Sequence, residues 1–402
     1  MTEDTNKALG IRSPWAGKAV RLEQLDEEIT FLWKISADNM RVSQNIGVRT
    51  SVLNLVVCVP TIQSAERASA VLRELASTQV ARVIILIFDH TANTANPVST
   101  WITLRSFPVI SDITRHTFEQ ITVLLNNSAS HYAANIIQPL LKPDLPIYLW
   151  WIGDPPVEST AFNRLATSSD RVIVDSATFL YPEQGICILT DLLRSSPHCA
   201  LSDLNWGRLT PLRQLVAQFF DATEYRPYLD GIHSIEIEHT VAFLGTPAYT
   251  AHGVISSEPM CALLLAGWLK ERLGWKFAAN TGLNQVDTTS GTYHWHMLCP
   301  DNQAAQIDIR PQVEPHMPPG SIYLLRLTSR VNQEQAQFVI DRESGPDHAQ
   351  TSVSLKEDTG PQRVVRLTDQ HRESTLLHAE LQITGHDYLF EETLQEMAAL
   401  LK

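Results

Sequence analysis

The chain has 402 residues, of which 44% are hydrophobic and 19% are charged. This composition is typical of a globular protein, and the length exceeds that of a usual single core, so we expect two domains. The formal net charge is −13. Because phosphates are bound by Lys and Arg, this acidic balance argues against a nucleic-acid partner and against an anionic membrane surface.

The N-terminal stretch MTEDTNKALGIRSPWAG is polar and lacks the apolar segment of a secretory signal. The apolar run at 260–269 is too short to cross a bilayer. We therefore expect a cytoplasmic protein without a membrane partner. The five cysteines include no CxxC motif, which fits a reducing compartment. Cys187 and Cys199 flank a polar stretch and are redox candidates, with ordinary packing as the alternative.

The first 50 residues form an N-terminal extension, in which Leu22, Leu25, Ile29 and Leu32 recur at helical spacing. From 51 to 203, strand patterns alternate with helix patterns. The expected strands are 51–60, 80–89, 118–127, 145–151 and 171–177, and the expected helices are 64–77, 128–141, 157–169 and 181–196. Ser64 is the expected N-cap of the first of these helices. This alternation predicts an α/β domain with a mainly parallel sheet covered on both faces.

From 204 to 402 the pattern changes to an α+β domain. Helices are expected at 210–221, with Thr210 as N-cap and Pro211 at N1, at 257–274, and at the end of the chain, 387–402. Short strands separated by turn residues are expected at 232–245, 291–298, 304–313, 321–329, 336–342, 351–358 and 362–369. Their apolar and polar residues alternate, which predicts an antiparallel sheet with one solvated face.

Familiar catalytic motifs are absent from the sequence. It contains no GxGxxG, GxxxxGK[ST], HExxH or GxSxG, and the stretch VPTIQSAER after the first strand has no glycine where a phosphate would need close backbone approach. His294 and His296 share a strand face, but no third ligand lies near them in sequence, so a hydrogen-bonded strand face is favoured over a metal site. We expect no catalytic residue, no cofactor and no metal.

Two aromatic segments are candidates for a functional surface. In LPIYLWWIGDPP, Trp150 and Trp151 are either core residues on the two faces of a central strand or walls of a groove at the carboxyl end of the sheet, with Asp154 at an exposed turn. In DLNWGRLTPLR, Trp206 is a similar case, and Arg208 and Arg213 accompany it in an otherwise acidic chain. The arginines form either a surface pair or a contact for an acidic partner.

Four blocks, taken in order, resemble the OpcA family, the glucose-6-phosphate dehydrogenase assembly proteins of cyanobacteria and actinobacteria. They are LPIYLWWIGDPP, RVIVDSA, SDLNWGRLTPLRQLVAQFFD and IHSIEIEH, and the resemblance extends over residues 50 to 390. It implies an N-terminal and a C-terminal domain and a non-catalytic protein that binds glucose-6-phosphate dehydrogenase and promotes its assembly and allosteric activation.

The resemblance also implies a place in the oxidative pentose phosphate pathway and, through the cyanobacterial system, thioredoxin as a second partner. It does not assign the residues that contact the dehydrogenase, so Trp150, Trp151, Asp154, Trp206, Arg208 and Arg213 are the partner-binding candidates. The alternative function is a sugar-phosphate or nucleotide-sugar enzyme with an unrecognised site in the α/β domain. A scaffold that binds without altering turnover is a third hypothesis.

Overall fold

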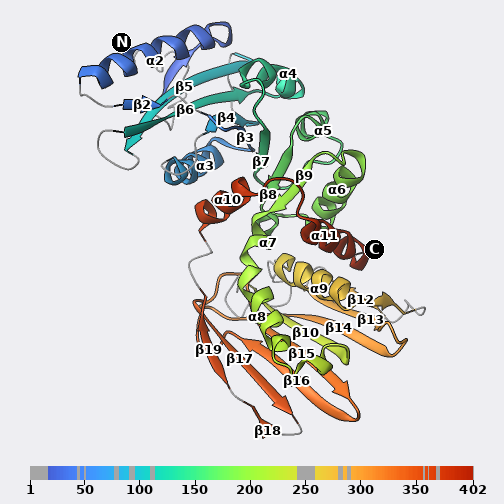
Figure 1. Ribbon diagram of the computed structural model, residues 1–402. Coiled ribbons are helices and arrows are strands. Elements are labelled where there is room, and N and C mark those ends of the chain that lie inside the picture. Colours follow the sequence, from blue (N-terminus) through green and yellow to red (C-terminus); the bar gives the residue numbers. More distant parts are fainter. Residues whose placement is uncertain are drawn as a thin grey trace, which may run out of the picture. The chain divides into compact units, whose positions relative to one another are not determined.

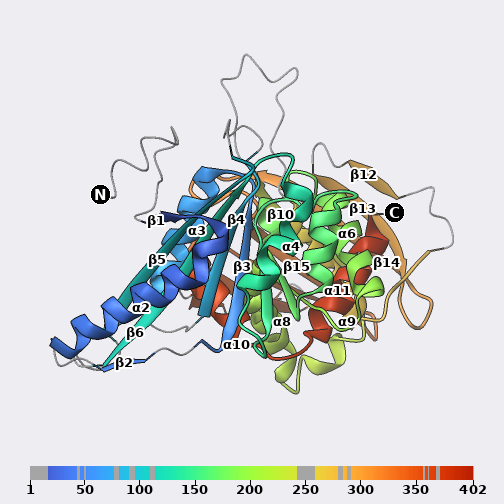
Figure 2. The same ribbon diagram turned by 90° about the horizontal axis from the view of Figure 1, so that it is seen from above.

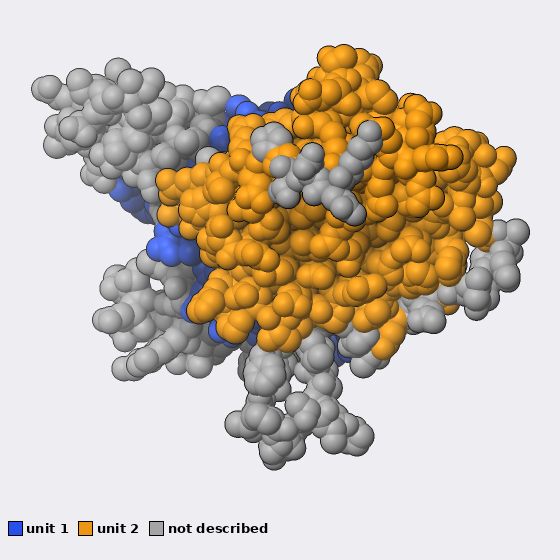
Figure 3. Space-filling model, turned by 90° about the horizontal axis from the view of Figure 1, so that it is seen from below, with its two compact units in different colours: residues 1–181, 191–202, 373–386 blue, residues 182–190, 203–372, 387–402 orange. Residues whose placement is uncertain are grey.

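The structure is a computed structural model. It describes residues 17–42, 46–48, 51–76, 81–89, 96–108, 114–241, 259–278, 284–287, 291–355, 358–360, 362–367 and 372–401. The chain forms two compact units that are discontinuous in sequence, coloured separately in Figure 3. Unit 1 comprises residues 1–181, 191–202 and 373–386, and unit 2 comprises 182–190, 203–372 and 387–402. The segments 1–50, 51–203 and 204–402 stay a prediction about domains.

Unit 1 is built on a nine-stranded mixed sheet that is mostly parallel (Figure 1). Its strands are β1 (Lys18–Val20), β2 (Ile46–Val48), β3 (Leu53–Val59), β4 (Ala81–Ile87), β5 (Val98–Pro108), β6 (Thr114–Leu125), β7 (Ile147–Trp151), β8 (Arg171–Val174) and β9 (Ala200–Asp203). Its strand order is β1-β5-β6-β4-β3-β7-β8-β9, with β2 beside β6. The predicted α/β unit with a mainly parallel sheet is confirmed.

The helices of unit 1 are α2 (Leu25–Val42), α3 (Ile62–Leu75), α4 (Ala133–Ile137), α5 (Thr160–Thr167) and, from the far end of the chain, α10 (Glu373–Gln382). Helix α6 (Pro182–Ser195) is divided, with residues 182–190 in unit 2 and 191–195 in unit 1. Helix α2 lies across the β5–β6 pair (Figure 2). Helix α10 packs on α3, where Arg67 pairs with Glu373 at 2.9 Å. The sequence did not predict β5, which pairs antiparallel with β6 along its whole length and with the short β1 on its other side.

The strands β3 and β4 are buried at every position, as their continuous apolar sequences predict for a sheet covered on both faces. The expected helix beginnings are wrong by a few residues. Helix α3 begins at Ile62 and its N-cap is Thr61, whose Oγ1 accepts a hydrogen bond from the Ser64 amide at 3.0 Å. In unit 2, the helix expected to be capped by Thr210 includes Thr210, because α7 (Leu204–Arg208) runs into it through a helical Leu209.

Unit 2 is built on a ten-stranded, mostly antiparallel sheet with the order β11-β13-β14-β10-β15-β16-β17-β18, in which β12 pairs with β13 and β19 with β17. Its strands are β10 (Ile232–Val241), β11 (Lys276–Phe277), β12 (Gln285–Asp287), β13 (Thr292–Leu298), β14 (Ala304–Val313), β15 (Ile322–Val331), β16 (Glu334–Asp341), β17 (His348–Leu355), β18 (Asp358–Thr359) and β19 (Arg363–Arg366). The pair β10–β14 is parallel. The predicted antiparallel character is therefore confirmed, with one parallel pair inside the sheet.

The helices α8 (Thr210–Asp221), α9 (Met260–Arg272) and α11 (Tyr388–Leu400) pack in unit 2, with α9 against β10 and β14 and α8 against β16. Alternation along β10 buries Ile235 and Ile237 and leaves Glu236 half-buried. Helices α9 and α11 approach closely, since a Cβ at Gly267 would lie 3.0 Å from the Thr393 carbonyl oxygen. Within the described residues, no helix has both the length and the apolar character needed to span a bilayer.

The register of β3 against β7 is fixed by the fully buried Asn54. Its Oδ1 accepts a hydrogen bond from the Lys142 amide at 2.8 Å, and its Nδ2 donates to the carbonyl oxygens of Lys142 and Leu145. The pairing that follows sets Cys58 opposite Trp151 at the carboxyl ends of the two strands. This one side chain thus aligns the two strand ends that form the candidate site.

We expect Asn54→Leu to lower the free energy of unfolding by about 3 kcal/mol, because it removes these bonds and leaves buried backbone groups unsatisfied. Urea denaturation measures the change. Asn163→Leu, a matched substitution at an exposed position of α5, should change the value by less than about 0.5 kcal/mol. Equal stability of the two variants would contradict the role given to Asn54.

Candidate functional site

The candidate site of unit 1 lies where the direction of winding changes. From β3 the sheet continues through β4 and β6 on one side and through β7, β8 and β9 on the other. Counted along the parallel strands, this is the 3-2-1-4-5-6 order of doubly wound sheets, whose ligands bind outside the carboxyl ends of the strands at this point. A ligand site in this sheet is therefore expected at the carboxyl ends of β3 and β7.

A pocket of about 650 Å³ occupies this position. Its walls come from the ends of β3 (Cys58–Pro60) and β7 (Trp151–Asp154), the start of α5 (Ser159–Ala161), Phe88 after β4 and Ser130–His131 after β6. The volume lies within the range of small-molecule sites. The groove that the sequence offered as one of two alternatives is thus present.

The two tryptophans have different environments. Trp150 is fully buried, so it has no surface with which to contact a partner. Trp151 lines the pocket and is 8% exposed. Its ring meets Phe162 edge-on at 4.9 Å between centroids, and its Nε1 donates to the Asp154 carbonyl oxygen at 3.1 Å. Trp151 is therefore a rigid wall, and both rings serve the core.

Asp154 does not lie at an exposed turn, as the sequence suggested, but is half-buried. Its carboxylate accepts two backbone hydrogen bonds, from the Leu180 amide at 3.0 Å and from the Tyr181 amide at 2.9 Å. These amides lie just beyond β8, so one side chain ties the loop after β7 to the loop after β8. Asp154 shapes the pocket and is already occupied as an acceptor.

The groups that bind phosphate in such folds are occupied from within. At the N-terminus of α3, the Ser64 amide donates to Thr61 Oγ1, and the Ile62 amide points at the Asp89 carboxylate, 3.4 Å away. An internal carboxylate thus lies where a helix N-terminus would otherwise attract an anion. None of the described residues that line the pocket is Lys or Arg.

The acid–base groups of the pocket do not form a pair suited to catalysis. Burial raises the pKa of the Cys58 thiol well above its ordinary value, which keeps it protonated and a poor nucleophile. Asp154 is held by two amides, while Glu158 is exposed. His131, also exposed, is the remaining titratable group among the described lining residues.

Large apolar side chains are exposed at one lining residue of the pocket and at three residues next to lining residues in sequence. Leu180, which lines it, is 80% exposed, and Tyr181 beside it is 62% exposed. Tyr132 and Val157 are 61% and 62% exposed and directly follow lining residues. Contiguous exposed apolar side chains rimmed by polar ones mark interaction sites. We call Tyr132, Val157, Leu180 and Tyr181 the apolar rim.

Trp206 and Arg213 lie in unit 2 and hold helices together. Trp206 is buried, and its Nε1 donates to Asp387 Oδ2 at 3.1 Å just before α11. The Arg213 guanidinium stacks on the Trp206 ring, 3.4 Å from its centroid, and donates to Thr210 Oγ1. Arg208, at the end of α7, is half-buried. Contact with a partner stays a prediction for these residues.

The two redox candidates differ in accessibility. Cys187 is exposed on α6, whereas Cys199 is fully buried and its Sγ donates weakly to the Ala200 carbonyl oxygen at 3.7 Å. Neither is in a disulfide. A reductant or oxidant in solution therefore meets Cys187 first.

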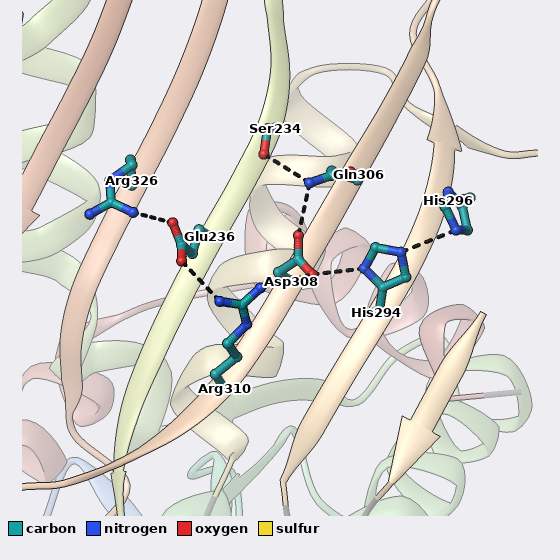
Figure 4. Close-up of polar contacts among 8 residues, drawn as sticks. All are labelled: Ser234, Glu236, His294, His296, Gln306, Asp308, Arg310 and Arg326. Carbon is teal, nitrogen blue, oxygen red and sulfur yellow. Dashed lines mark hydrogen bonds and ion pairs between the residues drawn. The ribbon is translucent and has the colours of Figure 1, made fainter. Parts of the chain in front are cut away.

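A polar network crosses one face of the unit 2 sheet (Figure 4). Glu236 on β10 pairs with Arg326 on β15 and with Arg310 on β14, and its neighbour Asp308 accepts a hydrogen bond from Gln306. Burial, and after it the charge of Glu236, raises the pKa of Glu238. The charges satisfy one another on a solvated face, where each pair contributes little to stability.

His294 and His296 form part of this network. Their Nε2 atoms are 3.1 Å apart, and His294 Nδ1 lies 2.7 Å from Asp308 Oδ1 (Figure 4). The hydrogen-bonded strand face expected from the sequence is confirmed. Asp308 is 14 residues away and is brought beside His294 by the β13–β14 register. The described residues contain no group of three or more His, Cys, Asp or Glu side chains placed to hold a metal ion.

Sequence reasoning missed Asp89, the residues of the apolar rim and Asp308. Asp89 ends the expected strand 80–89, and the carboxyl end of a parallel strand is a signal that was available in the sequence. The sequence had no comparable signal for the apolar rim. Leu180 and Tyr181 lie between a strand and a helix, where apolar residues are often buried, so their exposure could not be predicted.

The fold and the site define a class of protein. The pocket lies at the switch point of the sheet, the place beside β3 where the direction of winding changes, and its phosphate position is occupied by side chains of the protein. This protein has a doubly wound unit without a phosphate-binding loop in its described part, joined in sequence to a mostly antiparallel unit. Comparison with protein families gives a match in each of the two parts of the chain. Residues 72–190 match the glucose-6-phosphate dehydrogenase subunit N-terminal domain and residues 199–394 match the C-terminal domain of the same subunit. The chain belongs to the OpcA family.

Similar proteins of cyanobacteria are named OpcA and assigned by name to the OxPP cycle. The Synechocystis protein is 29% identical over 290 residues, which are 71% of this chain and 56% of that protein. The Nostoc punctiforme protein is 30% identical, over 71% of this chain and 57% of that protein. The chain thus spans somewhat more than half the length of the curated relatives it matches.

Solved structures with a related arrangement of elements are distant. A myo-inositol dehydrogenase from Lactobacillus casei is 10% identical with a TM-score of 0.40, covering 87% of this chain and 93% of that chain. A dehydrogenase from Clostridium difficile is 8% identical with a TM-score of 0.38, covering 87% and 97%. Likeness at this level supports no conclusion about function.

We expect Asp154→Asn to release the loop after β8, because the amide keeps one acceptor oxygen for two backbone donors. Hydrogen exchange at the Leu180 and Tyr181 amides should become at least tenfold faster, which corresponds to about 1.4 kcal/mol. Glu158→Gln, the same chemical change at an exposed lining residue, should leave these rates unchanged. Unaltered exchange in Asp154→Asn would show that the carboxylate does not hold the loop.

Proposed function

We propose that this protein is a non-catalytic partner of glucose-6-phosphate dehydrogenase that promotes assembly and allosteric activation of the enzyme in the oxidative pentose phosphate pathway. Membership of a family described as subunits of this dehydrogenase supports the partner. Activation would follow if the protein binds the active conformation or oligomer of the enzyme more tightly than the inactive one. We place this partnership in the cytoplasm, as the sequence predicts.

The apolar rim is the observation that carries the proposal. Four large side chains in unit 1, between 61% and 80% exposed, belong to a residue that lines one pocket or to residues that directly follow lining residues. Aromatic and aliphatic anchors beside a pocket are typical of the energetic centre of a protein–protein interface. Asp154 holds two of these residues in place through their amides, so the surface is formed before a partner arrives.

A non-catalytic role is supported by the chemistry of the pocket. Its described lining offers a protonated Cys58 thiol, a carboxylate committed to two amides, no Lys or Arg, and His131 and Glu158 only at exposed positions. General acid–base catalysis needs a positioned group that is free to exchange a proton. Phosphoryl-bearing substrates need cationic groups or free helix amides, which this lining does not supply.

A second candidate is a sugar-phosphate or nucleotide-sugar enzyme, and the pocket beside Trp151 and Asp154 is the observation that favours it. The lack of cations among the described lining residues opposes it. Turnover of a sugar phosphate by the purified protein, lost on substitution of a pocket residue, would support this enzyme over the partner. The redox link remains part of the proposal, with Cys187 as the accessible thiol for thioredoxin and Cys199 as the buried one.

We expect the purified full chain to co-elute with glucose-6-phosphate dehydrogenase in gel filtration. It should also lower the KM of the enzyme for its substrate or raise its rate at least twofold in a steady-state assay. Co-elution without a kinetic change would support the scaffold hypothesis instead. Neither co-elution nor a change in kinetics would refute the proposed partnership.

We expect Leu180→Asp to weaken binding to the dehydrogenase at least tenfold, because a charge on the apolar rim would be desolvated at the interface. Phe31→Asp is the matched control, since Phe31 is a 53% exposed apolar residue of unit 1 on α2. Affinity is measured by biolayer interferometry, with thermal unfolding as a check of the fold. Equal affinities for both variants would remove the apolar rim from the interface.

A further inference from the structure

We propose that the switch-point pocket of unit 1 binds an uncharged ring compound of nucleoside size. This inference goes beyond the partnership with the dehydrogenase and does not depend on it. The pocket lies at the carboxyl ends of β3 and β7, where doubly wound sheets bind ligands. Its volume of about 650 Å³ leaves ample room for one base and one sugar.

The walls favour a ring with apolar faces. Trp151, Phe88 and Pro60 are apolar lining residues, and the Phe88 and Trp151 rings lie 5.8 Å apart between centroids. Trp151 is fixed by its contacts with Phe162 and with the Asp154 carbonyl oxygen. A rigid apolar wall binds a flat ring without loss of side-chain freedom. The ligand class therefore includes a planar or near-planar ring system.

Exposed polar lining residues favour a ligand with hydroxyl or amide groups. The side chains of Asn127, His131 and Thr160 line the pocket and make no hydrogen bond to another described residue. They come from the segment after β6 and from the start of α5. Polar groups without an internal partner can fix the orientation of a bound molecule in a mainly apolar pocket.

Charge excludes the phosphorylated forms of the same compounds. The described lining contains Asp154 and Glu158 but no Lys or Arg. At the N-terminus of α3, Thr61 and Asp89 already take the amides that would meet a pyrophosphate. A phosphate here would lose its hydration without gaining a cation, so a nucleoside should bind better than its nucleotide.

The test is isothermal titration calorimetry of the full chain with adenosine, guanosine, cytidine and uridine, each compared with its 5′-monophosphate, and with NADP⁺. We expect at least one nucleoside to bind with a submillimolar dissociation constant and its monophosphate to bind at least tenfold more weakly. No binding of any nucleoside overturns the proposal. Equal or tighter binding of the monophosphates or of NADP⁺ overturns the ligand class.

Two variants locate the site. Thr160→Trp places a large ring in the pocket from an exposed position of α5 and should abolish binding, whereas Asn163→Trp, exposed on the same helix outside the pocket, should retain it. His131→Ala, which keeps the pocket open, should weaken binding at least threefold even if Thr160→Trp does not fold. Full affinity in His131→Ala and in folded Thr160→Trp would place the ligand elsewhere and overturn the site. Binding to the dehydrogenase, measured separately, tests the partnership independently.

Discussion

The parallel pairing of β3 with β7 is the constraint on which unit 1 depends. It joins the half of the sheet that winds through β4 and β6 to the half that winds through β7, β8 and β9. Asn54 fixes this pairing by using its amide as both donor and acceptor toward the segment before β7. A shift of one residue would turn every side chain of the strand to the other face. Trp150 would then leave the core and Trp151 would leave the pocket wall.

The site at this junction combines the architecture of a nucleotide-binding fold with chemistry that opposes phosphate. Thr61 and Asp89 satisfy amides of α3, and Asp154 satisfies amides after β8. Each of these oxygens stabilises the loops without a ligand. The same groups leave an apolar rim beside a preformed pocket, which we propose to contact a protein partner and to hold a neutral ring compound. Architecture and function are separable here because the ligand-binding loops vary while the sheet remains.

In unit 2 the two faces of the sheet differ in polarity. Its apolar face packs against α8 and α9, and Gly267 allows α9 and α11 to approach closely. The opposite face carries the network around Glu236 and Asp308, in which neighbouring strands supply opposite charges. The stack of Arg213 on Trp206 and the bond from Trp206 to Asp387 connect α7 and α8 to the start of α11. The family block DLNWGRLTPLR is thus explained in part by packing.

The sequence by itself determined most of the succession of strands and helices and the sheet class of each unit, because these depend on local apolar periodicity. It did not predict β5, β9 or α10. It also determined the family, through blocks of residues in a fixed order. The tertiary structure decided the rest. Asp154 meets an amide 27 residues away, His294 meets a carboxylate 14 residues away, and Ser374 on α10 donates to Glu74, 300 residues away, on α3. Such contacts depend on strand order and register, which no local pattern encodes. For the same reason, the sequence left open whether Trp151 is a core residue or the wall of a groove. Only the packed sheet shows that its ring packs in the core and also lines the pocket.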